Sequence, residues 1–426
     1  MAISIKQDSV DEASTVDTQS CADCHRSTTV LFAPGEGPDM DPDLSALDEA
    51  LDGAGVDGYL VDADSDVPDQ RYLSGFDAPD PFVTLYDGDT HLLVSALEYG
   101  RATTASRAET VARHSDYTEG AGSREVAGEV LAAFLDDHGV SSVLVPPRFP
   151  VGVADDLRER DVAVTSEDNG SGVLTDIRAV KTDAEIESVR DAQRANERAM
   201  AAAEELLCEA TIEGDRLVHD GETLTAERVK IEIETTLLHE GCALSETIVA
   251  SGADAADPHD RGSGPIAPGE AIIVDIFPRD NETGYHADMT RTFVKGEPSD
   301  RVREWYDLTH EALRAALGAV EPGATGANVH DAVCDVYEDS GEPTLRADPE
   351  TETGFIHGTG HGVGLAVHEL PSLSFEGGEL EPGNVVTIEP GLYDPDVGGV
   401  RIEDFVVVTE DGYENLTAYP KSLRVE

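Results

Sequence analysis

The sequence predicts an α+β fold in which a smaller α/β domain, over residues 40–175, precedes a larger α+β domain over residues 176–426. Three observations support this prediction. Strand and helix patterns alternate through the first region, a polar, glycine-rich loop at 167–172 separates the two regions, and the second region repeats one motif at two places. A length of 426 residues also suits two or three domains.

The first region opens with leucines at positions 44, 47 and 51, whose spacing is that of one helix face. Short apolar runs then alternate with helical patterns, and the run over 82–95 contains a glycine-bearing turn that is typical of a hairpin. We therefore expect further helices near 125–137 and 153–160, and strands at 58–61, 82–87, 90–95, 142–145 and 162–165.

The second region opens with a capping-box pattern, Thr182-Asp-Ala-Glu185, which predicts a long helix running toward Cys208. A second helix is expected over 225–240, and a second pair of helices over 299–320 and 328–340. Strand patterns lie between and after these helices, so this domain is expected to be α+β.

The repeated motif consists of Pro-Gly, a strand of buried type and then a carboxylate seven residues after the proline. It occurs over 268–275, ending in Asp275, and over 382–389, ending in Glu389. A second acid follows each copy, Asp288 after 13 residues and Glu403 after 14. Two helix pairs, each followed by strands that carry two acids, indicate a duplicated domain with a pseudo-twofold axis.

The charge balance is extreme, with 88 Asp plus Glu against 29 Lys plus Arg and a formal net charge of −59. Such a field repels phosphate backbones and anionic membranes, so we expect neither a nucleic-acid nor a membrane partner. The acids are spread along the chain and 39% of the residues are hydrophobic, enough for a sizeable core. This composition resembles that of cytosolic proteins from extreme halophiles.

The N-terminal segment over residues 1–39 is rich in small and polar residues without an apolar period, and we expect a disordered tail there. Within it, Cys21 and Cys24 precede a histidine, a pattern open to haem attachment or to half of a zinc site, although the other three cysteines supply no second ligand pair. With no secretory signal and no long apolar run, we expect a cytoplasmic protein with reduced thiols.

Four acids stand out because they lie among strand-forming apolar residues rather than on a polar face: Asp275, Asp288, Glu389 and Glu403. Burying four carboxylates close together is costly unless cations neutralise them. The sequence therefore indicates a bound pair of metal ions.

A glycine-rich segment over 355–369 supplies nitrogen ligands, since it contains His357, His361 and His368. Glycines at 358, 360, 362 and 364 disfavour a helix and allow the backbone to approach a ligand closely. Three histidines within twelve residues favour a functional role over a structural one.

These motifs, in their order, resemble the five-ligand signature of the pita-bread metallopeptidases, the superfamily of aminopeptidase P, prolidase, methionine aminopeptidase and creatinase. The resemblance rests on Asp275, the block Tyr-His-Ala-Asp288-Met-Thr-Arg-Thr, the His361 segment, Thr-Ile-Glu389-Pro-Gly-Leu-Tyr and Val-Arg-Ile-Glu403-Asp. It covers residues 176–426, and more loosely the first domain, which resembles the creatinase N-terminal domain.

The resemblance implies two divalent metal ions, with manganese as first choice and cobalt, zinc or iron as alternatives. Asp275 would bind one ion, His361 and Glu389 the other, and Asp288 and Glu403 both. Glu389 would also act as the base for the attacking water. His259 and His368 would stabilise the oxyanion, and His357 and Arg401 would orient ligands. Departures from the family pattern, a longer Asp275–Asp288 interval and an Asp directly after His259, lie at the mouth of the expected pocket.

The leading functional interpretation is a peptidase that releases the N-terminal residue from X-Pro peptides, with a peptide as its substrate and a homodimer as its expected assembly. An Xaa-Pro dipeptidase is the alternative, disfavoured because the sequence offers no dedicated cation for a dipeptide's carboxylate other than Arg401. A creatinase-like hydrolase and a non-catalytic binding protein are further alternatives, and both fit an intact ligand set poorly.

Overall fold

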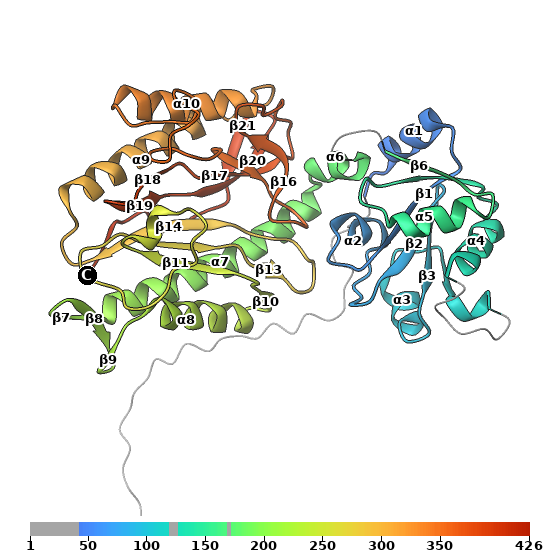
Figure 1. Cartoon of the computed structure of the whole chain (residues 1–426), viewed down its shortest axis with the longest axis horizontal. Helices are drawn as coiled ribbons and strands as arrows, with labels where there is room; N and C mark the ends of the chain where they lie inside the picture. Colours follow the sequence, from blue (N-terminus) through green and yellow to red (C-terminus); the bar gives the residue numbers. More distant parts are fainter. Residues whose placement is uncertain (1–41, 119–126, 168–171) are drawn as a thin grey trace, which may run out of the picture. The chain divides into compact units, whose positions relative to one another are not determined.

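The computed structural model describes residues 42–118, 127–167 and 172–426 (Figure 1). The segment expected to be a disordered tail, with Cys21 and Cys24, lies outside these ranges. In the described ranges, no helix combines the length and the apolar character needed to cross a membrane. Cys208, Cys242 and Cys334 are free thiols.

The first domain contains a six-stranded mixed sheet in the order β4-β3-β2-β1-β5-β6. Its central strand β1 pairs antiparallel with β2 and parallel with β5. The strands are β1 (Gly58–Ala63), β2 (Phe82–Tyr86), β3 (Thr90–Val94), β4 (Thr110–Arg113), β5 (Ser142–Val145) and β6 (Ala163–Ser166). The helices are α1 (Ser45–Ala54), α2 (Pro68–Ser74), α3 (Tyr99–Ala105), α4 (Ala127–Asp137), α5 (Val151–Arg158) and α6 (Val173–Ala179), with a 3₁₀ turn at His114–Asp116.

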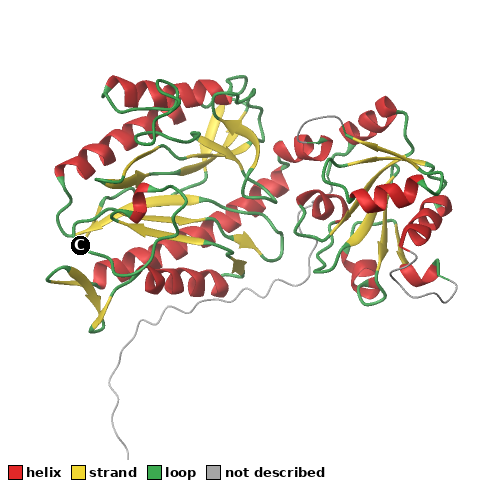
Figure 2. Ribbon diagram, viewed as in Figure 1, coloured by secondary structure: helices red, strands yellow, loops and turns green. Residues whose placement is uncertain are grey.

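Helices cover both faces of this sheet (Figure 2). Along β1, Leu60 packs into one core with α4 and α5, while Tyr59 and Val61 pack into another with α1 and α2. Because successive side chains of a strand point to opposite faces, a continuous apolar run buries both of them.

The second domain has four layers, with a helix pair outside each of two sheets (Figure 1). The first half consists of α7 (Asp183–Glu209), α8 (Ala226–His239) and a sheet in the order β11-β12-β14-β22, formed by Thr247–Ser251, Ile272–Ile276, Met289–Lys295 and Arg424–Val425. The second half consists of α9 (Asp300–Ala319), α10 (Gly326–Asp339) and a sheet in the order β16-β15-β17-β20-β21, formed by Glu369–Leu373, Gly360–Gly362, Val385–Ile388, Asp404–Thr409 and Gly412–Asn415.

Three small sheets complete the second domain. They are β7-β8-β9 (Thr211–Glu213, Arg216–His219, Glu222–Thr223), β10-β13 (Cys242–Ala243, Arg279–Asp280) and β18-β19 (Gly391–Asp394, Gly398–Arg401), with a 3₁₀ turn at Asp254–Ala256. Each half has its own apolar core, and each core joins one helix pair to the buried faces of its sheet. The matching order of helices and strands bears out the predicted internal repeat.

The predicted start of the long helix is confirmed in atomic detail. The Thr182 hydroxyl accepts a hydrogen bond from the Glu185 amide at 3.4 Å, and a Glu185 carboxylate oxygen accepts one from the Thr182 amide at 2.7 Å. These bonds satisfy amides that have no partner within the helix. Several short elements were not predicted from the sequence, namely α2, α3, α6 and the β7–β9 sheet, because each is too short to show a period.

Candidate metal centre

The repeat brings the four singled-out acids together on or directly beside interior strands of the two sheets. Asp275 lies on β12 and Asp288 directly precedes β14, while Glu389 directly follows β17 and Glu403 directly precedes β20. A backbone hydrogen bond connects the two halves of the second domain at this point, because the Glu403 amide donates to the Thr290 carbonyl at 3.1 Å. Each acid thus lies within a strand or directly beside one, where pairing fixes the backbone.

The fifth predicted ligand, His361, lies on β15, and its position requires its glycine neighbours. A Cβ on Gly360 would lie 2.0 Å from the Thr387 carbonyl oxygen, and one on Gly362 would lie 2.0 Å from the Leu370 carbonyl oxygen. Only glycine permits strands this close on both sides of His361. The two glycines therefore serve packing around the histidine.

The five side chains converge on one cavity of about 910 Å³. One carboxylate oxygen from each of Asp275, Asp288 and Glu403 lies within 4.8 Å of the others. His361 Nε2 lies 3.4 Å from Glu389 Oε1 and 3.9 Å from Asp288 Oδ2. All five predicted ligands thus face a common space that could hold metal ions.

Burial and repulsion between like charges raise the pKa values of three carboxyl groups in this cluster. The pKa of Asp288 lies well above its ordinary value because the group is buried and faces Glu403 and Asp275. Burial, followed by the charges of Glu389 and Asp275, raises the pKa of Glu403 well above the usual range. The pKa of Glu389 rises to about 7, again mainly through burial. Without added cations, this cluster holds protons near neutral pH.

One buried cation partly offsets the negative charge. Arg401, at the end of β19, is 3% exposed, and its Nη2 donates to Asp275 Oδ2 at 2.7 Å. Its Nη1 donates to the Tyr393 hydroxyl at 2.9 Å, and that hydroxyl lies 3.0 Å from His357 Nε2. The two residues predicted to orient ligands are therefore connected through Tyr393, and only Arg401 touches a ligand.

Two buried carboxylate oxygens without hydrogen-bond partners indicate that these residues could bind a metal pair. Among the described residues, Asp275 Oδ1 and Glu403 Oε1 are buried oxygens without any hydrogen-bond partner. Native proteins rarely leave buried carboxylate oxygens unpaired, because desolvating them costs free energy. Both atoms belong to the three-carboxylate group, and oxygens supplemented by one imidazole suit divalent manganese, cobalt, zinc or iron.

The two histidines assigned to oxyanion stabilisation also line the cavity. His259 and His368 are both exposed. The His368 ring packs edge-on against the His361 ring with centroids 4.3 Å apart. The structure thus places an exposed imidazole directly beside a candidate ligand.

Sequence reasoning missed several polar groups of the site. Thr290 Oγ1 donates to Glu403 Oε2 at 2.9 Å, and Thr387 Oγ1 donates to Glu389 Oε1 at 3.2 Å. Both threonines belong to strands, where the residue type alone signals only strand preference. Tyr393 and Arg261 were also missed. Arg261 lies two residues after His259, and this spacing was the available signal.

Comparison with known proteins gives two family matches. Residues 187–410 match the family described as metallopeptidase family M24, and residues 44–190 match the creatinase/prolidase N-terminal domain. These matches agree with the fold and with the superfamily predicted from the motifs.

Curated relatives include the Xaa-Pro dipeptidase of Pyrococcus furiosus, 35% identical over 256 residues, which are 59% of this chain and 66% of that protein. The probable dipeptidase PepE of Mycobacterium tuberculosis is 37% identical over 256 residues, or 59% of this chain and 62% of that protein. The chain thus spans a little under two thirds of the length of these relatives.

Solved structures resemble the chain over most of its length. The Xaa-Pro dipeptidase of Bacillus anthracis has a TM-score of 0.75 at 28% identity, covering 90% of this chain and 99% of that one. The X-Pro aminopeptidase of Thermotoga maritima has a TM-score of 0.72 at 26% identity, covering 87% and 98%.

Proposed function

Because the chain belongs to metallopeptidase family M24, we propose that it is a metal-dependent peptidase that hydrolyses X-Pro dipeptides. This proposal replaces the Xaa-Pro aminopeptidase favoured by the sequence alone. Two observations support the change: the curated relatives include Xaa-Pro dipeptidases, and the cavity has a cation that sequence reasoning overlooked.

That cation is Arg261, and its position in the cavity lining is the main observation behind the proposal. Among the described residues, two arginines line the cavity. Arg401 forms an ion pair with the largely buried Asp275, whereas the Arg261 side chain is 59% exposed. A dipeptide places its carboxylate one residue beyond the bond to be cut, so it needs a cation inside the cavity rather than an open channel. Arg261 presents a planar fork that matches a carboxylate.

Arg261 forms an ion pair with Glu246, which also lines the cavity. The Glu246 side chain is 48% exposed, and ion pairs this exposed contribute about 0–1 kcal/mol. A substrate carboxylate can therefore replace Glu246 on the guanidinium at small cost. The pair also keeps the Arg261 side chain near the cavity mouth before substrate binds.

The metal pair would be held by Asp275, Asp288, His361, Glu389 and Glu403. When bound, two such ions supply Lewis-acid polarisation of the scissile carbonyl and lower the pKa of water to near neutrality. Glu389 accepts the proton of the attacking water and delivers one to the leaving proline nitrogen.

The remaining cavity residues position the substrate. His259 and His368 donate hydrogen bonds to the carbonyl oxygen as it gains charge. Arg401 holds Asp275 in a fixed orientation, and Tyr393 and His357 hold Arg401. A proline nitrogen has no N–H, so binding relies on the carbonyl and the free carboxylate of the dipeptide.

Three substrates test this function with manganese-loaded protein in molar KCl. We expect turnover of Ala-Pro, far slower turnover of Ala-Pro-Ala, no turnover of Ala-Ala-Ala, and loss of activity on chelation. Preferential cleavage of Ala-Pro-Ala would restore the aminopeptidase interpretation. Comparable cleavage of Ala-Ala-Ala would refute X-Pro specificity, and full activity without metal would refute the metallopeptidase assignment.

A further inference from the structure

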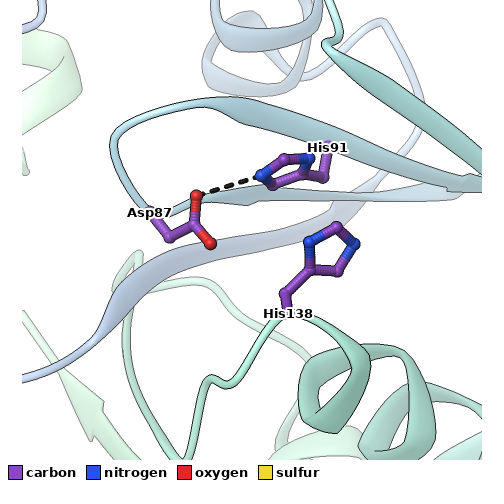
Figure 3. Close-up of side chains that lie close together, drawn as sticks. All are labelled: Asp87, His91 and His138. Carbon is purple, nitrogen blue, oxygen red and sulfur yellow. Dashed lines mark hydrogen bonds and ion pairs between the residues drawn. The ribbon is translucent and has the colours of Figure 1, made fainter.

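A second cluster of metal-binding side chains lies in the first domain, far along the chain from the five catalytic ligands. It consists of Asp87, His91 and His138 (Figure 3). Asp87 directly follows β2 and His91 is the second residue of β3, so one hairpin supplies both. His138 directly follows α4. One ligand atom from each residue lies within 4.8 Å of the others.

The geometry of the hairpin pair already approaches that of metal ligands. His91 Nε2 lies 3.0 Å from Asp87 Oδ1. Around a tetrahedral zinc ion with bonds of about 2.0–2.2 Å, ligand atoms are separated by roughly 3.3–3.6 Å. An ion between these two atoms would therefore need only a small widening of their present distance.

A third group fixes the orientation of His91. Its Nδ1 lies 2.9 Å from Thr110 Oγ1 on the neighbouring strand β4, and the residue is 6% exposed. Metal-binding histidines usually use one ring nitrogen for the ion and hold the other in a hydrogen bond that sets ring orientation. Here Thr110 forms the orienting hydrogen bond with Nδ1, and His91 Nε2 faces Asp87.

His138 completes the group from the other element. Its ring packs on the His91 ring, with centroids 4.0 Å apart and planes inclined by 32°. The ring also packs edge-on against Phe134, with centroids 4.9 Å apart. Within the described part of the chain, neither His138 ring nitrogen takes part in a hydrogen bond. The side chain is half-buried, and one of its ring nitrogens already lies within 4.8 Å of the ligand atoms of the other two residues.

The surroundings favour a cation. His138 follows the last residue of α4, where the unpaired carbonyls of a helix end carry partial negative charge. Asp137 adjoins it, and the chain as a whole has a net charge of −59. A carboxylate with two imidazoles suits ions of the zinc type, whereas the oxygen-rich catalytic cluster suits manganese as well.

We propose that Asp87, His91 and His138 bind one divalent ion of the zinc type, which clamps the β2–β3 hairpin to the C-terminal end of α4. The site is separate from the catalytic cluster and does not depend on the proposed function. Its three ligands come from residues 87 to 138 of the sequence, so the ion would cross-link two elements that are otherwise joined by packing.

Equilibrium dialysis of the full chain against Zn²⁺ tests the site. We expect His138→Ala and Asp87→Asn each to bind one zinc ion fewer per chain than the wild type. His239→Ala, which removes an exposed histidine from α8, should bind as many as the wild type. His138 is the preferred target because His91 is buried, and Asp87→Asn retains the shape of the side chain.

Activity measured in parallel separates this proposal from the proposed function. Manganese-dependent peptidase activity of His138→Ala should equal that of the wild type, because the residue lies outside the catalytic cavity. A zinc count that is unchanged in both variants would overturn the site. Inactive wild-type protein would overturn the proposed function while leaving the difference in zinc count unaffected.

Discussion

Replacing Arg401 by methionine would test whether its charge compensates the carboxylate cluster. The substitution keeps a long apolar stem but removes four hydrogen bonds, at 2.7 Å to Asp275, 2.9 Å to Tyr393, 3.1 Å to Thr290 and 3.4 Å to the Pro258 carbonyl. It leaves Asp275 without a partner on either oxygen, since Oδ1 has none in the described structure. Breaking a buried ion pair costs about 3–5 kcal/mol.

The cost should depend on metal. The hydrogen bonds to Tyr393, Thr290 and Pro258 are lost with or without metal, at about 0.5–1.5 kcal/mol each. In metal-loaded protein the ions neutralise Asp275, so the cost of the broken ion pair is not added to this loss. At about 2–4 °C per kcal/mol for a domain of this size, the broken ion pair alone should lower the Tm of metal-free Arg401→Met by about 6–20 °C. With saturating Mn²⁺ the decrease should be clearly smaller.

Differential scanning calorimetry with and without Mn²⁺ measures both values. Arg346→Met is the matched control, because Arg346 pairs with Asp331, Asp335 and Glu338 away from the cavity. Its Tm decrease should be the same in both conditions. If Arg401→Met lowers the Tm equally with and without metal, the argument that both Arg401 and the ions neutralise the carboxylate cluster is refuted.

Three further predictions concern substrate, protons and salt. Arg261→Ala should raise the KM for Ala-Pro at least tenfold, about 1.4 kcal/mol, with a smaller effect in Arg261→Lys; an unchanged KM would remove Arg261 from the substrate site. Because the pKa of Glu389 is raised to about 7 and that of Asp288 lies well above normal, Mn²⁺ binding should release protons at pH 7. The raised pKa of Glu389 also stabilises metal-free protein below about pH 4.5, and this contribution is lost as the pH rises through about 7. Calorimetry in buffers of different ionisation enthalpy would show the release, and a proton count of zero would contradict it. The net charge of −59 predicts a higher Tm in molar KCl than in dilute buffer, since salt shortens the Debye length to about 3 Å; an equal or lower Tm would refute that prediction.

The sequence predicted the repeat and its chemistry because both are local patterns. The Pro-Gly motifs, the strands after them and the acids at their ends are readable within about ten residues, and the capping box at Thr182 marks a helix start without tertiary information. The glycines around His361 also had a local signal, although their packing role emerged only from the neighbouring strands.

Contacts between distant segments could not be predicted in this way. Tyr393 joins His357 to Arg401, and Thr290 reaches Glu403 across 113 residues of sequence. Arg261 was missed because its spacing from His259, the available signal, shows neither the exposure of its side chain nor the cavity that it lines. Likewise, nothing in the sequence shows that His138, at a helix end, packs against His91 on a strand.

The central claim is that five residues of the repeat hold two metal ions. Crystals soaked in Mn²⁺ and measured at its absorption edge would locate the ions directly by anomalous scattering. The structure predicts two neighbouring peaks in the catalytic cavity, contacted by Asp275, Asp288, His361, Glu389 and Glu403. A cavity with no peak, or with a single one at full occupancy, would contradict the claim.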